Sequence, residues 1–73
     1  MKEIFEGYQL TSKCKRTLDG RYSVGVLIEK SVNNAHYKEK YTDTKINLIL
    51  EIEAEKEAIN FGKSLIKKRM ISF

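Results

Sequence analysis

Apolar positions with helical spacing mark the C-terminal third of the chain. Between residues 51 and 69 they recur every three or four residues and form one wide arc at about 100° per residue. Glutamates fill the first half of this segment and basic residues the second, which complements the helix dipole at both ends. We therefore predict a helix over residues 51–69 whose apolar arc needs a partner surface. The arc consists of Leu50, Ile52, Ala54, Ala58, Ile59, Phe61, Leu65 and Ile66.

Alternating apolar and polar positions predict three strands before this helix, over residues 8–15, 21–30 and 36–43. The second is rich in β-branched residues and is expected at the centre of the sheet. Gly62 lies on the core side of the helix, where it allows a strand or a large ring to approach closely. The strand residues expected to face the helix are Tyr8, Leu10, Cys14, Tyr22, Val24, Val26, Ile28 and Tyr41.

Turn residues separate these segments. Asp19-Gly20 suits a two-residue type I′ turn, in which both positions have positive φ. Asn33-Asn34 can supply the left-handed conformations of a second turn. Residues 42–45 read as a polar break, and residues 46–50 fit either a short fourth strand or an early start of the helix. Residues 1–7 are too few to predict an element.

Together these elements predict an α+β fold. We expect residues 1–73 to form a single small domain, a three-stranded antiparallel β-meander with one C-terminal α-helix packed on one face. The other face of the sheet is then left open.

Composition limits the chemistry. One cysteine, Cys14, excludes an intrachain disulfide, and no Cys/His cluster suggests a metal. His36, the single histidine, has no sequence spacing to a nucleophile that suggests a dyad or triad, and we read it as a surface residue. We therefore expect a protein that is not an enzyme and has no catalytic residue, metal or cofactor. With no apolar run that could span a membrane, the expected location is the cytoplasm.

The open sheet face is the one candidate binding surface. The chain carries 14 Lys and Arg against 10 Asp and Glu, a net charge of +4. Five basic residues are expected on this face, with Glu29 as the main opposing charge and the backbone of Gly25 left bare at its middle. A flat basic surface of this kind can follow the phosphates of DNA or RNA. The candidate nucleic-acid-binding residues are Lys13, Lys15, Arg21, Lys38 and Lys40.

Two other interpretations stay open. A sheet covered on one side must show polar residues on the other, and lysines on exposed strands discourage aggregation, so the basic face can also be a solvated surface without a ligand. Alternatively, the chain is a protein-interaction or homodimerisation module that uses a sheet edge and the apolar C-terminal tail of Met70, Ile71 and Phe73. Salt separates the two binding modes, because only phosphate contacts weaken steeply with added salt.

Several turn and core residues resemble a group of small uncharacterised bacterial proteins. The shared pattern is Gly-Tyr, then Asp-Gly-Arg followed by an aromatic residue, a hydrophobic strand, and a helix that ends in Phe-Gly and Leu-Ile. The chain departs from it with Tyr22 in place of Trp and with Ile52-Glu53-Ala54 at the helix start. The resemblance implies three strands and a helix, and no catalytic residue. The matching positions are Gly7-Tyr8, Asp19-Gly20-Arg21-Tyr22-Ser23, Val26, Ile28, Ala54, Phe61-Gly62 and Leu65-Ile66.

The predicted fold alone is similar to AP2-type and integrase arm-type DNA-binding domains, which place an open sheet face in the major groove. Those domains read bases with several Arg and Trp side chains. This chain has no Trp and offers Arg21 and Arg16 in that region. The comparison is an analogy between folds, and a fold does not fix a function.

Overall fold

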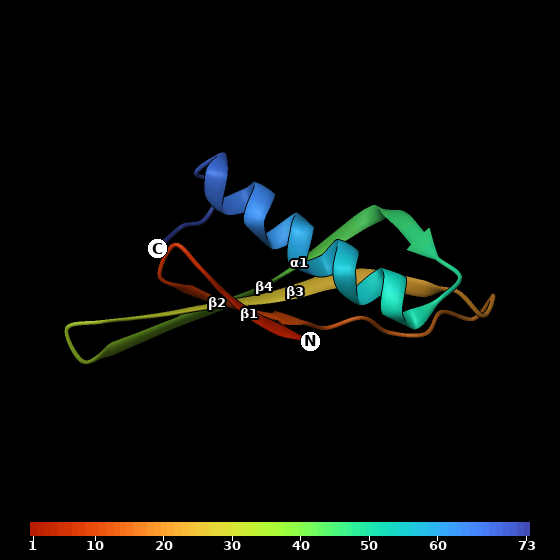
Figure 1. Cartoon of the computed structure of the whole chain (residues 1–73), viewed down its shortest axis with the longest axis horizontal. Coiled ribbons are helices and arrows are strands. Elements are labelled where there is room, and N and C mark those ends of the chain that lie inside the picture. The colour runs from red at the N-terminus through yellow and green to blue at the C-terminus, as the bar shows by residue number, and fades with distance from the viewer.

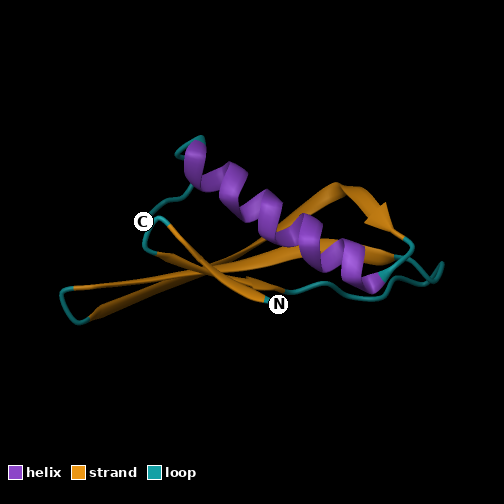
Figure 2. Cartoon of the chain, in the orientation of Figure 1, coloured by secondary structure: helices purple, strands orange, loops and turns teal.

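The computed structural model describes residues 1–73, apart from the side chain of Lys45. Its four strands form one antiparallel sheet in the order β1-β2-β3-β4, and α1 crosses one face of that sheet (Figure 1, Figure 2). The α+β class and the C-terminal helix are confirmed, but the sheet has four strands rather than three. The elements are β1 Lys2–Phe5, β2 Tyr8–Ser12, β3 Tyr22–Val32, β4 Ala35–Leu48 and α1 Glu51–Lys67.

The extra strand, β1, pairs with β2 through a tight turn at Glu6 and Gly7, whose φ values are 50° and 84°. It was missed because its four residues, two polar and then two apolar, show no alternation: Ile4 lies on the face away from the helix and is 68% exposed. Phe5 faces the helix side and packs against the edge of the core. The β1 strand therefore widens the sheet without adding much to its core.

The first long hairpin, between β2 and β3, is confirmed, but β2 ends at Ser12 instead of continuing to residue 15, and the turn type differs from the prediction. Only Gly20 has positive φ, and its N–H donates to the carbonyl of Thr17. The N–H of Thr17 in turn donates to the carbonyl of Arg21. This is a three-residue loop in which a glycine follows a type I turn, instead of the expected two-residue type I′ turn.

The second hairpin, between β3 and β4, turns at Asn33 and Asn34 as predicted, with φ values of 49° and 67°. Residues 42–45 do not break the strand, because β4 continues to Leu48. The register shifts there: Val24 pairs with Asp43 while Ser23 pairs with Asn47. A polar stretch can continue along an edge strand because one side of that strand needs no partner, so residues 46–48 belong to the third predicted strand.

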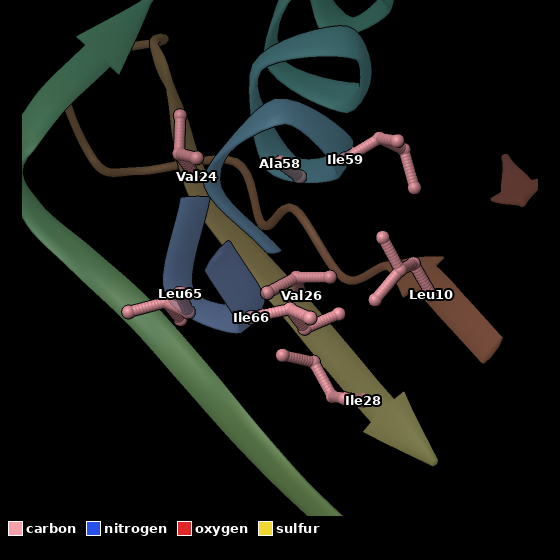
Figure 3. Packing of buried hydrophobic residues seen from close by; sticks show 8 residues of the cluster. All are labelled: Leu10, Val24, Val26, Ile28, Ala58, Ile59, Leu65 and Ile66. Carbon is pink, nitrogen blue, oxygen red and sulfur yellow. The ribbon is translucent and has the colours of Figure 1, made fainter. Parts of the chain in front are cut away.

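The core lies between the sheet and α1 (Figure 3). Val24, Val26 and Ile28 of β3 are almost fully buried, which confirms the predicted face of the central strand. A Cβ built on Gly62 would lie 3.1 Å from Val26 Cγ2 and 3.2 Å from Leu10 Cδ2, so the glycine admits strand side chains rather than a ring. The side chains of the cluster are Leu10, Val24, Val26, Ile28, Ala58, Ile59, Leu65 and Ile66.

The helix begins at Glu51 as predicted and ends at Lys67, two residues early. Arg69 has a φ of 54° and cannot continue the helix. Leu50 and Ile52 are 53% and 50% exposed, which corrects their place in the buried arc. Both lie at the edges of that arc, in or just before the first turn.

Candidate nucleic-acid interface

The face of the sheet opposite α1 is not covered by any element (Figure 1). Strand register arranges its side chains in rows that cross all four strands. One row joins Lys2, Thr11, Leu27 and Lys40. The next joins Ile4, Gln9, Glu29 and Lys38. We call this surface the open face; lysines lie on both of its outer strands.

Lys13 and Lys15 lie just beyond the end of β2, where the backbone still bonds to β3. The N–H of Lys13 donates to the carbonyl of Gly25 at 2.7 Å, and the carbonyl of Lys15 accepts from the N–H of Ser23 at 2.8 Å. Gly25 itself is buried, which corrects the expectation of a bare backbone there. A Cβ on Gly25 would lie 2.6 Å from the carbonyl oxygen of Lys13 and 3.6 Å from Lys40 Cε. The backbone carbonyl of Lys13 and the side chain of Lys40 therefore cover Gly25.

Arg21 lies apart from these rows, in the loop at the end of the β2–β3 hairpin. Its Nε is 4.0 Å from Asp19 Oδ2, and both side chains are more than half exposed. The hydroxyl of Thr17 donates to Asp19 Oδ1 and, with the Arg21 N–H, lowers the pKa of that carboxyl. The structure thus places Lys38 and Lys40 on the open face, bonds the backbone of Lys13 and Lys15 to β3, and leaves Arg21 at the margin beside a carboxylate.

Charge is divided between the two sides of the sheet. Among the described strand side chains, Glu29 is the one carboxylate on the open face, whereas Glu3, Glu39 and Asp43 belong to the helix side. Glu3 forms an ion pair with Lys63 of α1. Glu39 accepts a hydrogen bond from the hydroxyl of Tyr41. Burial of Tyr41 raises the pKa of that hydroxyl, and the neighbouring Glu39 carboxylate raises it further. The open face is therefore more basic than the net charge of the chain suggests.

Aromatic side chains gather on the helix side. Tyr37 stacks on Phe73 with ring centroids 5.9 Å apart. Tyr22 lies at the start of β3, half-buried. The aromatic residues packed against the core are Phe5, Tyr8, Tyr41, Phe61 and Phe73. The two rows described above thus contain no ring on which an unpaired base could stack. The exposed imidazole of His36, opposite Ser31, is the ring that lies on this face.

Thr11 occupies the middle of the open face with an unusual environment. Its side chain is 8% exposed, and its hydroxyl oxygen has no hydrogen-bond partner among the described residues. A buried hydroxyl without a partner costs about 1–3 kcal/mol. Thr11 lies between Lys2 and Leu27, so this cost falls at the centre of the open face and not at its edge.

A hydrogen-bonded group on the β3–β4 hairpin was missed by the sequence analysis. His36 Nδ1 is 3.1 Å from Ser31 Oγ, and His36 Nε2 is 2.9 Å from Glu29 Oε2. The predicted turn at Asn33-Asn34 could have indicated this group, because it places residue 31 opposite residue 36. These are the residue types of a catalytic triad, but the imidazole is 53% exposed. Its two hydrogen bonds join β4 to β3 across the hairpin.

The apolar tail folds back onto the protein. Ile71 and Phe73 pack against the core, and the hydroxyl of Tyr8 donates to the carbonyl of Phe73 at 3.0 Å. Met70 is 61% exposed. Of the three tail residues considered for a protein contact, two are thus engaged within the chain.

Comparisons with known proteins identify no relative: no family model, curated protein or solved structure matches this chain. Within the described residues no helix is both long and apolar enough to cross a membrane. Nor do the described side chains include three His, Cys, Asp or Glu groups placed to hold a metal ion.

Proposed function

We propose that this chain is a small non-catalytic protein that binds nucleic acid through its open face, and that a duplex is its preferred ligand. The observation that carries the proposal is the division of charge, with lysines on both outer strands of the open face and one strand carboxylate, Glu29, among them. Neutralising phosphates with lysines releases counterions from the nucleic acid, which drives binding without sequence readout.

The position of the aromatic residues supports a duplex over a single strand. Proteins that hold single strands combine a basic groove with aromatic side chains on which bases stack. Here the aromatic side chains pack around the helix side, where they stabilise the fold. A flat basic surface without a Phe, Tyr or Trp ring, whose one described imidazole, His36, is hydrogen-bonded at both nitrogens, suits a ligand whose bases are already paired and whose phosphates lie outside.

Thr11 adds a second argument. Its hydroxyl has no hydrogen-bond partner among the described residues and lies at the centre of the open face. Valine would fill the same space without that cost, and natural sequences accept such costs most often at functional sites. The environment of Thr11 therefore fits a surface kept for a ligand better than one kept only for solubility.

The test is fluorescence anisotropy with a labelled mixed-sequence duplex of about 16 base pairs and the same strand unpaired, at low and moderate salt. We expect the duplex to bind more tightly and the affinity to fall steeply with salt. Replacing Lys13, Lys15, Arg21, Lys38 and Lys40 by Gln should weaken binding more than about tenfold and reduce the salt slope by about 1 for each lost phosphate contact. The variant should keep its circular dichroism spectrum.

A matched control removes five positive charges from the helix and the residues after it: Lys56, Lys63, Lys67, Lys68 and Arg69. Its duplex affinity should stay within about threefold of the unmodified protein, because these charges lie away from the open face. Equal losses in the two variants would show that net charge alone drives binding. Self-association that resists salt, with no duplex binding, would instead support the protein-interaction alternative.

A further inference from the structure

The β3–β4 hairpin extends past the rest of the sheet. Pairing between β2 and β3 ends at Gln9 and Glu29, whereas β3 and β4 continue to pair as far as Val32 and Ala35 (Figure 1). Residues 30–37 thus form a two-stranded ribbon, which helps to give the molecule its long axis of 43 Å. We call these eight residues the ribbon. The side chains of Ser31, Val32, Asn33, Asn34 and His36 on it are exposed.

We propose that this ribbon enters the major groove of a B-form duplex while the lysines of the open face contact the flanking phosphates. This inference rests on the proposed function and names the part of the interface that reaches the bases.

Width decides which part of the sheet can enter a groove. Four strands at about 4.8 Å spacing separate the outer strand axes by about 14 Å before side chains are added. The major groove is about 12 Å wide and about 8.5 Å deep and admits a two-stranded ribbon, whereas the minor groove is about 6 Å wide. The whole open face is therefore too wide to enter, and the ribbon fits the major groove alone.

The length of the ribbon also matches. From Glu29 to Val32 the strand advances about 10 Å at about 3.3 Å per residue, close to the depth of the major groove. Lys38 lies just behind the ribbon and pairs with Glu29, the last residue of β3 that also pairs with β2. With the turn at the groove floor, Lys38 lies at the rim, where the phosphates are.

The exposed end of the ribbon carries groups that can read base edges. Asn33 and Asn34 present side-chain amides at the turn, and asparagine can bond adenine through two atoms in the major groove. Ser31 adds a hydroxyl on the open side, held by its hydrogen bond with His36. No carboxylate occurs within residues 30–37 to repel the duplex.

Contacts at its base hold the ribbon in place. An isolated two-stranded hairpin is marginally stable in water. Here Tyr37 stacks on Phe73, and the ammonium group of Lys30 lies 4.5 Å from the centre of the Tyr8 ring. On the opposite side His36 bridges Ser31 and Glu29. A ribbon ordered before binding loses less conformational entropy when it enters a groove.

The test replaces Asn33 and Asn34 together by Gly. Both positions have positive φ, which glycine adopts without strain, so the turn is kept and only the two amides are lost. We expect the unmodified protein to protect guanine N7, a major-groove atom, from methylation by dimethyl sulfate. The glycine variant should lose that protection and bind the duplex more than about fivefold less tightly. A control variant replaces Asn47 and Asn60 by Ala, two exposed residues outside the ribbon, and should bind normally.

The outcomes separate the two proposals. If the unmodified protein fails to bind the duplex at low salt, the proposed function is wrong. If it binds in a manner that needs the open-face lysines, but without N7 protection and with equal affinity in the glycine variant, only the ribbon proposal is wrong. Protection of adenine N3 in place of guanine N7 would place the ribbon in the minor groove and would also overturn it.

Discussion

Leu27 and Ile28 are neighbours on β3, yet they belong to different parts of the molecule. Ile28 points toward α1 and is fully buried, whereas Leu27 lies on the open face between Thr11 and Lys40. The helix side holds the aromatic rings, most strand carboxylates and the core. The open face holds lysines around a small polar and apolar centre. This contrast suggests that substitutions on one side change stability and those on the other change binding.

The largest expected effect comes from the neighbouring pair itself. Ile28→Ala should lower the free energy of unfolding by about 2–5 kcal/mol, because it leaves a cavity beneath the helix. Leu27→Ala removes a side chain of similar size from a half-buried site and should cost about 1 kcal/mol. Urea unfolding of both variants measures the difference. Equal losses would mean that the open face is packed as tightly as the core, against the contrast drawn here.

Gly25 is expected to be an exception to this contrast, because it lies on the open face and yet matters for stability. It belongs to the open face, but an added Cβ would meet the Lys13 carbonyl oxygen at 2.6 Å. That oxygen is backbone and cannot move alone, so Gly25→Ala should destabilise the protein by about 1–3 kcal/mol. Thermal unfolding checks this, with Val32→Ala, an exposed residue of the same strand, as the control. An unchanged melting temperature would show that the chain around Lys13 adjusts without cost.

The smallest effect is expected at Thr11, and in the opposite direction. Thr11→Val removes a buried hydroxyl that has no partner among the described residues. The substitution should raise the free energy of unfolding by about 1 kcal/mol. Urea unfolding measures it, with Thr42→Val, an exposed threonine of β4, as the control. A loss of stability would mean that the Thr11 hydroxyl is hydrogen-bonded after all.

Local periodicity explains what could be predicted. The 3.6-residue repeat predicted the start of α1 and most of its buried face, and alternation predicted Val24, Val26 and Ile28 as core. The same alternation placed Lys38 and Lys40 opposite Tyr37 and Tyr41, as the structure has them. These predictions need only the geometry of one element at a time.

Contacts between residues distant in sequence explain the features of the fold that could not be predicted. The β1 strand is too short to show a pattern and forms because β2 offers it an edge. The polar stretch at residues 42–45 remains strand because β3 pairs with the residues on both sides of it. Gly25 is covered because the backbone carbonyl of Lys13 lies against it. In each case a residue distant in sequence decides the environment.

The sequence by itself determined which side of each long strand is apolar, where the helix begins, and that lysines share the opposite face, because side-chain direction follows from local backbone geometry. Only the tertiary structure decided how many strands the sheet has and how far β3 and β4 extend beyond β2. It also decided that Phe73, at the far end of the chain, packs on Tyr37 at the base of the ribbon. These features depend on the relative lengths of paired strands and on contacts across the whole chain, which no local pattern contains.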